Sequence, residues 1–423
     1  YNMPAAAAFS WLTALVVLIL QLPSVAILPR PLHFTAQHGG EEHYCAYSYV
    51  GLIACPFIFL FVGMFWQDMH RPRMVFLDKF CIHQTDPLLK QAGIRGIAGI
   101  LRHSEQLVVL WTASYFTRLW CTYELASWIH LGKSRIRFVP VSFASLACLM
   151  MLLMFAQCAV SAIYETFRGD IPIWLSCFAW SIFSILGAAS AQRHVHELGS
   201  LPKQLANFSV QGTRCFCCDV GHVHPKTLET VPCDRKLVYD ALAGWFAQRE
   251  QASEFSETAE LNHLHFFDHE VRKTIHAHLQ ITGGYRVAYR DAVILSSPVV
   301  WFYVPRAAYL ASLPPLEWGR WALFIMTLVF AALPNAYHLF FTVSGCLERN
   351  LVGNRGGNCS LQLLATLFSS ICMFCIFLFS WVLLSFPFFY VRSQLWLILV
   401  CSILGALTVI LYRGCFGFRL RMS

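Results

Sequence analysis

Long apolar runs separated by polar segments dominate the pattern of hydrophobic and polar positions along the chain. Eight of these runs are close to the roughly 20 residues that a helix needs to cross the hydrocarbon core of a bilayer. They cover residues 5–28, 45–66, 140–164, 171–191, 292–313, 321–343, 361–386 and 395–412. The pattern therefore predicts a membrane all-α bundle of about eight transmembrane helices.

Composition supports this prediction and excludes two classes of protein. Hydrophobic residues make up 57% of the 423 residues and charged residues 13%, whereas a soluble domain has about 45–50% apolar and about 25% charged residues. A water-soluble globule is therefore excluded. Intrinsic disorder is excluded as well, because it requires low hydrophobicity and high net charge.

Two longer polar regions interrupt the apolar runs and divide the chain into five parts. We expect two transmembrane helices in 1–66, an α/β unit in 67–143, two transmembrane helices in 140–191, a Cys/His-containing helical region in 192–291 and four transmembrane helices in 292–423.

Positive charge is distributed unevenly between the two sides of these predicted helices. Twenty-six Lys and Arg residues, including those of both polar regions, fall on one side and four fall on the other. Because cytoplasmic loops of membrane proteins collect Lys and Arg, this count places both termini and both polar regions in the cytoplasm, without identifying the membrane. The same asymmetry accounts for the net charge of +8, so the predicted partner is the lipid bilayer and not nucleic acid.

The first polar region alternates between short apolar runs, typical of buried parallel strands, and segments with helical periodicity. Strands are predicted at 74–78, 106–111 and 136–143, and helices at 87–103 and 118–129. Asp86 is suited to cap the first of these helices, with Pro87 at its first position. Strands that alternate with helices through short links predict a parallel, doubly wound sheet.

These residues resemble the middle and later part of a Toll/interleukin-receptor (TIR) domain. In that family a strand ends in Asp, a helix ends in Ser, another strand follows, and then come Tyr, Trp-Cys and Glu-Leu. The matching positions are Asp78, Ser104, Tyr115, Trp120, Cys121, Glu124 and Leu125. The segment with Asp78, Cys81, Ile82 and Gln84 also resembles the Asp-x-x-Cys-Ile-x-Gln hallmark of the related heterokaryon-incompatibility domain. The resemblance implies a small cytoplasmic α/β unit with a parallel sheet.

The resemblance also implies a site, because the functional crevice of an open parallel sheet lies beyond the carboxyl ends of its strands. The residues expected to line it are Asp78, Lys79, Cys81, Gln84, Trp111, Tyr115 and Trp120. In NAD-cleaving members of the family the Glu of this motif contacts the ribose of NAD, and Glu124 occupies the matching position. A carboxylate there can stabilise an oxocarbenium-like centre. The alternative is a surface Glu favoured by the helix dipole in a unit that signals or scaffolds without catalysis.

The sequence departs from the TIR pattern at two points. The first TIR strand has no counterpart between residues 67 and 75. We expect this strand before Tyr1, in a longer chain. The Ser that follows the third strand is replaced by Trp111-Thr112. Both departures weaken the enzymatic interpretation.

Cysteine and histidine gather in the second polar region. Cys215 and Cys218 have the C-x₂-C spacing that places two thiolates on one Zn²⁺, and His222, His224 and Cys233 can complete a tetrahedral site. Reduced cytosolic thiols, or palmitoylated ones, are the alternatives to zinc. The segment that follows, 236–280, predicts amphipathic helices that pack against the TIR-like unit or the membrane face.

Three functions therefore remain open from the sequence. The first is a polytopic membrane protein with a cytoplasmic TIR-like unit for signalling or interaction, through self-association or protein partners. The second is a channel or transporter with a regulatory cytoplasmic unit, although ionisable groups, which such proteins need in their spans, are scarce here. Arg306, inside the fifth run, is functional, snorkels to the interface, or shows that this span is misplaced. The third is a membrane-anchored NAD glycohydrolase that uses Glu124.

Overall fold

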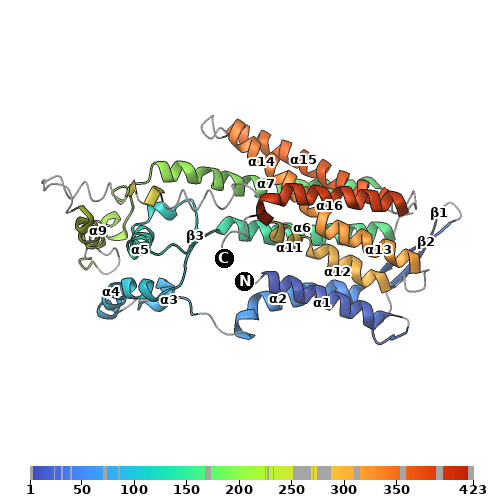
Figure 1. Ribbon diagram of the computed structural model, residues 1–423, viewed down its shortest axis with the longest axis horizontal. Helices are drawn as coiled ribbons and strands as arrows, with labels where there is room; N and C mark the ends of the chain where they lie inside the picture. The colour runs from blue at the N-terminus through green and yellow to red at the C-terminus, as the bar shows by residue number, and fades with distance from the viewer. Residues whose placement is uncertain are drawn as a thin grey trace. The chain divides into compact units, whose positions relative to one another are not determined.

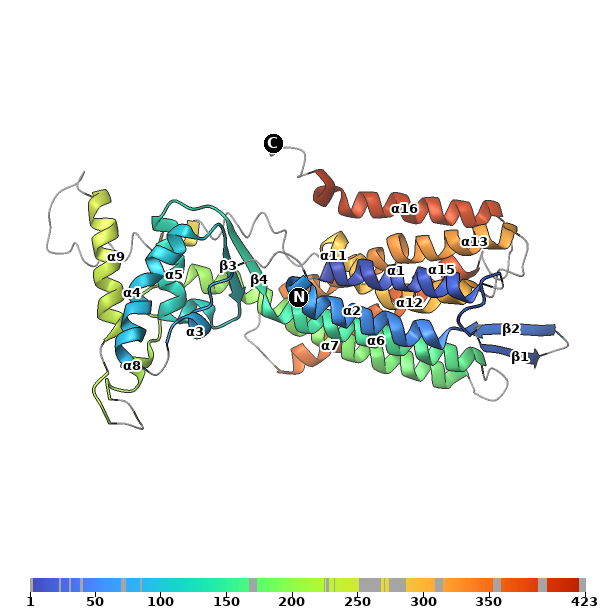
Figure 2. The ribbon, with the colours of Figure 1, turned by 90° about the horizontal axis from the view of Figure 1, so that it is seen from below.

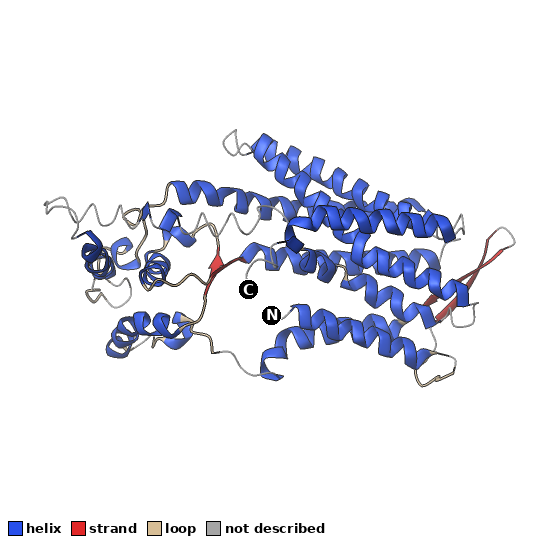
Figure 3. Cartoon of the chain, viewed as in Figure 1, coloured by secondary structure: helices blue, strands red, loops and turns tan. Residues whose placement is uncertain are grey.

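The described part of the chain folds mainly into helices, and its strands form two short pairs (Figure 3). The computed structural model describes residues 3–22, 24–29, 32–38, 41–69, 74–83, 86–166, 173–223, 225, 228–231, 233–250, 268–269, 271–273, 287–308, 315–352, 359–386 and 394–417. Two compact units are present. The helical unit comprises 1–73, 145–195 and 285–423, and the α/β unit comprises 74–144 and 196–284.

The helical unit is a bundle whose long helices run along one common direction (Figures 1 and 2). Its helices are α1 (Met3–Gln21), α2 (Tyr49–Met69), α6 (Val141–Thr166), α7 (Ile173–Ala206), α11 (Tyr289–Leu295), α12 (Ser297–Arg306), α13 (Pro315–Thr327), α14 (Leu333–Leu347), α15 (Cys359–Phe386) and α16 (Gln394–Gly417). Two π-helical segments, η3 (Leu328–Ala332) and η4 (Glu348–Val352), precede and follow α14. The first residues of α6 and the last residues of α7 belong to the α/β unit.

Six helical stretches in the described part of the chain are long and apolar enough to cross a membrane. They are Met3–Gln21, Tyr49–Trp66, Val141–Ser161, Trp318–Asn350, Ser360–Ser380 and Gln394–Tyr412. The other two expected spans stay predictions. Run 171–191 begins outside the described residues and continues into α7, and run 292–313 is divided between α11 and α12, of 7 and 10 residues. At about 1.5 Å per residue, neither of these short helices alone crosses a hydrocarbon core of about 30 Å.

A hairpin precedes α2, where the sequence predicted the beginning of a span at residue 45. Strands β1 (Leu32–His38) and β2 (Glu41–Tyr47) pair antiparallel, from Leu32 opposite Tyr47 to His38 opposite Glu41. The helix begins only after Ser48, whose Oγ accepts a hydrogen bond from Gly51 N at 3.2 Å. A serine that caps the helix in this way fixes its start, so the predicted boundary was wrong.

In its described residues the α/β unit contains one two-stranded parallel sheet, β3 and β4 in Figure 2. Its elements are α3 (Asp78–Cys81), α4 (Pro87–His103), β3 (Leu107–Trp111), the 3₁₀ turn η1 (Tyr115–Thr117), α5 (Leu119–His130), β4 (Ile136–Pro140), α8 (Phe216–Asp219) and α9 (Asp234–Glu250). Leu107 lies opposite Ile136 and Trp111 opposite Pro140. Asp86 caps α4 as predicted, because its Oδ1 accepts from Leu88 N at 2.9 Å and from Leu89 N at 3.2 Å.

The predicted strand at 74–78 is absent. Residues 74–77 have no regular structure, Asp78 begins α3, and Met74 and Val75 are 97% and 74% exposed. A short apolar run becomes a strand only where a neighbouring ladder accepts it, and within the described residues β3 and β4 pair only with each other. The predicted strand at 136–143 ends early, at Pro140, and Val141 begins α6. The sheet is therefore two-stranded and not three-stranded.

Both polar regions contribute to one hydrophobic core in the α/β unit. Ile97, Leu125 and Trp128 of the first region pack in the same cluster as Leu205 and Val238 of the second. The backbones also meet directly: Leu119 N donates to Arg214 O at 3.1 Å, and Arg214 N donates to Thr117 O at 2.6 Å. Two regions that share a core lie on the same side of any membrane that the helical unit crosses.

Candidate functional site

Glu124 lies in the second turn of α5, the helix that follows β3 through the turn η1. Glu124 is half-buried, while Leu125 and Ala126 beside it are fully buried. Tyr115, in η1, is 8% exposed, and its hydroxyl donates to Cys121 O at 3.4 Å. Burial raises the pKa of Tyr115 above its ordinary value, and the negative charges that Cys121 and Glu124 can carry add to this effect. Glu124 is therefore near the neutral phenol of Tyr115 in η1.

The other residues expected to line a crevice fall into three groups. Trp111 and Tyr115 belong to the hydrophobic core. Cys81 is exposed, and its Sγ accepts from Leu77 N at 3.4 Å. Trp120 is half-buried and donates its indole N–H to Asp234 Oδ2 at 3.3 Å.

For the remaining expected lining residues, Asp78 and Lys79 form the first turn of α3, but their side chains lie outside the described part of the chain, as does Gln84. The crevice was expected at the carboxyl ends of strands 74–78 and 106–111, and the first of these two strands is absent. A catalytic role for Glu124 therefore stays a prediction.

A second candidate site is built around the short helix α8. Cys215 precedes this helix, and Cys217 and Cys218 lie in its single turn. The Cys217 Sγ is 3.1 Å from Cys215 Sγ and 3.9 Å from Cys218 Sγ. Donor atoms of Cys217, His222 and Cys233 also lie within 4.8 Å of one another. The cluster thus gathers four thiols and one imidazole around Cys217.

The backbone conformation directly after α8 explains why the His222 side chain lies in this cluster. Gly221 and His222 both have positive φ angles, of 64° and 62°, in the left-handed region that reverses the chain after a helix. His222 N then donates to Cys217 O at 2.8 Å. On the other side, Asp234 N donates to Cys217 Sγ at 3.3 Å. Cys217 therefore accepts backbone hydrogen bonds from both His222 and Asp234.

The thiols differ in how readily they lose a proton. Burial, followed by hydrogen bonding to Cys217, raises the pKa of Cys215 to about 12. Burial also acts to raise the pKa of Cys217, but hydrogen bonds from Cys215, from the backbone near Asp234 and from Cys218 outweigh it, and the net shift is downward. The pKa of Cys218 is raised, mainly by burial. The surroundings therefore favour a thiolate at Cys217 in particular.

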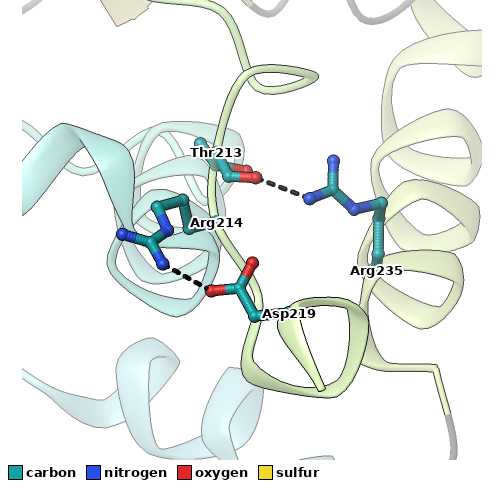
Figure 4. Close-up of polar contacts among 4 residues, drawn as sticks. All are labelled: Thr213, Arg214, Asp219 and Arg235. Atoms are coloured by element: carbon teal, nitrogen blue, oxygen red, sulfur yellow. Dashed lines mark hydrogen bonds and ion pairs between the residues drawn. The ribbon is translucent and has the colours of Figure 1, made fainter. Parts of the chain in front are cut away.

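Polar contacts hold the chain on either side of the cluster (Figure 4). The Arg235 guanidinium donates to Thr213 O at 2.6 Å and to Gln211 O at 2.9 Å. Arg214 and Asp219 form an ion pair at 3.1 Å, with side chains 75% and 42% exposed. An exposed pair of this kind contributes little stability, so the two bonds of Arg235 are the main tie between residues 211–213 and the first turn of α9.

Cys217 is the residue of this site that the sequence did not predict. Of the predicted ligands, Cys215, Cys218, His222 and Cys233 belong to the cluster, and His224 lies outside the described residues. The predicted C-x₂-C pair spans Cys217, and the consecutive cysteines at 217 and 218 were the available signal.

Comparisons with protein-family models, with curated proteins and with solved structures find no match to this chain. The TIR resemblance therefore stays a prediction based on residues 74–143.

Proposed function

We propose that the chain is a polytopic membrane protein whose α/β unit is a cytoplasmic, TIR-like signalling module that acts by self-association. The observation that carries this proposal is a pair of exposed apolar side chains on one face of β3, where exposed Arg137 and half-buried Val139 of β4 lie opposite them. Along β3, Val109 and Trp111 are 2% and 1% exposed, whereas Val108 and Leu110 are 49% and 58% exposed. Parallel sheets are normally covered on both faces, so this face favours a partner.

The edges of the sheet support the same proposal. Within the described residues, β3 and β4 each pair on one side only, so each strand offers backbone N–H and C=O groups along its other edge. Such an edge next to apolar side chains is suited to accept another strand. A second copy of the unit is the partner to which we commit, because the TIR resemblance implies association between like modules.

Substitution of Leu110 in the full chain tests the proposal. Leu110→Asp places a charge on this face of β3, while the residue is exposed enough for the fold to tolerate it. Leu88→Asp is the matched control, since Leu88 is 79% exposed in the first turn of α4, where an acidic residue is favourable. We expect the wild type and Leu88→Asp to be dimeric in detergent by light scattering and Leu110→Asp to be monomeric. A monomeric wild type, or a dimer unchanged by Leu110→Asp, would contradict the proposal.

A transport function is the second candidate, and one observation in the helical unit favours it. Gln192 Nε2 donates to Ser369 Oγ at 2.7 Å, and Ser344 Oγ lies 3.0 Å from Ser369 Oγ. All three residues are buried, and hydrogen-bonded polar groups inside a membrane bundle can mark a pathway.

Electrical recording from the purified protein in planar bilayers tests this second candidate. A conductance that changes in Ser369→Ala would support transport. A silent bilayer would leave signalling by the α/β unit as the function.

A further inference from the structure

One distance in the cluster around Cys217 matches that between two ligands of a tetrahedral metal ion. Each Zn–S bond is about 2.3 Å long, so two thiolates on the same tetrahedral zinc lie about 3.8 Å apart. The Cys217 and Cys218 sulfurs are 3.9 Å apart. The Cys215 sulfur is only 3.1 Å from Cys217, which is shorter than the separation of two zinc ligands and suits a hydrogen bond between the two sulfurs.

Two further donors approach Cys217 and bring the candidate ligands to four. The donor atoms of His222 and Cys233 lie within 4.8 Å of Cys217 Sγ and of each other, and Cys233 also lies near Cys218. Three thiolates and one imidazole form a standard structural zinc set with no open position for water. Soft sulfur donors also disfavour magnesium and calcium.

The protein around these donors is arranged as it is around bound metals. Asp234 N donates to Cys217 Sγ at 3.3 Å, and Cys215 Sγ is the neighbour described above. Such hydrogen bonds to a coordinating sulfur orient the ligand and stabilise its negative charge. The positive φ angles of Gly221 and His222 turn the chain so that an imidazole four residues after Cys218 meets the same point.

We propose that Cys217, Cys218, His222 and Cys233 bind one structural zinc ion. On binding, the coordinating thiols release their protons to solvent and the imidazole binds as the neutral ring. The ion ties α8 to the residue directly before α9. There the Asp234 carboxylate accepts the indole N–H of Trp120, so the zinc holds the start of α9 against α5. This proposal is independent of self-association.

Elemental analysis of the full-length protein in detergent tests the proposal. We expect about one zinc ion per wild-type chain and the absorption bands of tetrahedral cobalt(II) after substitution with cobalt. Cys217→Ser should lose the metal, whereas His222→Cys should keep it, because a thiolate can replace the imidazole in such sites. Cys177→Ser is the matched control, since Cys177 is an exposed cysteine of α7, and it should keep the metal.

Each alternative outcome has a clear meaning. A folded wild type without zinc would overturn the proposal, as would stoichiometric zinc in Cys217→Ser. Iron or copper in place of zinc, or a disulfide between Cys215 and Cys217 in the protein isolated under reducing conditions, would overturn it as well. If Cys217→Ser does not fold, the wild-type stoichiometry together with His222→Cys still decides the question.

Discussion

Lys133 caps the carboxyl end of α4, and we predict that this cap stabilises the end of the helix. Gly132, with a φ of 67°, ends α5 in a left-handed turn in which Gly132 N donates to Ile129 O and Lys133 N donates to Trp128 O. This arrangement satisfies the last carbonyls of α5. It also directs the Lys133 ammonium to α4, where Nζ donates to Leu101 O at 2.9 Å, Arg102 O at 2.6 Å and Ser104 O at 2.5 Å.

The magnitude follows from these contacts. A helix end leaves its last carbonyls without helical partners, and a cation there also interacts favourably with the helix dipole. Lys133 is half-buried, so water can replace part of each bond, and we take the low end, about 0.5 kcal/mol for each of the three. The ammonium also lies 4.8 Å from the centre of the Trp128 ring, a contact that adds about 0.5 kcal/mol. Lys133→Met should therefore destabilise the end of α4 by about 2 kcal/mol.

Hydrogen exchange measured by mass spectrometry on the full chain checks this prediction. A loss of about 2 kcal/mol speeds exchange in the last turn of α4 by about 30-fold where local opening limits exchange. Lys236→Met is the control, because Lys236 is exposed on α9. Equal exchange in Lys133→Met and Lys236→Met would refute the reasoning.

Three further predictions concern packing and pH. Leu125→Ala should destabilise the α/β unit by about 2–5 kcal/mol, because Leu125 is fully buried, whereas Glu124→Ala should cost less than about 1 kcal/mol; equal losses in urea denaturation would contradict this. Because burial raises the pKa of Tyr115 above its ordinary value of 10.0, the side chain stays neutral in the folded protein, and the free energy of unfolding falls as the pH rises above 10.0. Tyr115→Phe should reduce this loss of stability, and an unchanged pH profile of unfolding would contradict the prediction. Gly51→Ala should weaken the contact of α2 with α12, because an added Cβ would lie 2.6 Å from Pro305 Cγ; a thermal midpoint equal to that of the wild type would contradict this.

Local signals predicted part of the α/β unit. Asp86 and Pro87 marked the start of α4, and the periodicity around Leu125 and Trp128 marked α5, because caps and helical faces depend on neighbours in sequence. The strand at 74–78 failed because strand formation depends on a partner ladder, which the sequence of one segment does not contain.

Long-range contacts could not be predicted. The two polar regions contact each other through pairs such as Leu119 with Arg214 and Trp120 with Asp234. The two residues of each pair are about a hundred positions apart in the sequence. For the cysteine cluster, spacing identified the region but not the donors, because the positive φ of His222 and the position of Cys233 decide which sulfurs meet.

Site-resolved labelling with a membrane-impermeant thiol reagent tests the central claim most directly, namely that both polar regions form one cytoplasmic unit. Three reporters suffice in sealed vesicles with the cytoplasmic face outward: the exposed native Cys81, Glu229→Cys in the second polar region, and Ser24→Cys between the first two spans, all at exposed positions. Mass spectrometry should find Cys81 and Glu229→Cys modified in intact vesicles, and Ser24→Cys modified only after detergent. Labelling of Cys81 and Glu229→Cys from opposite sides, or of Ser24→Cys together with them in intact vesicles, would contradict the account.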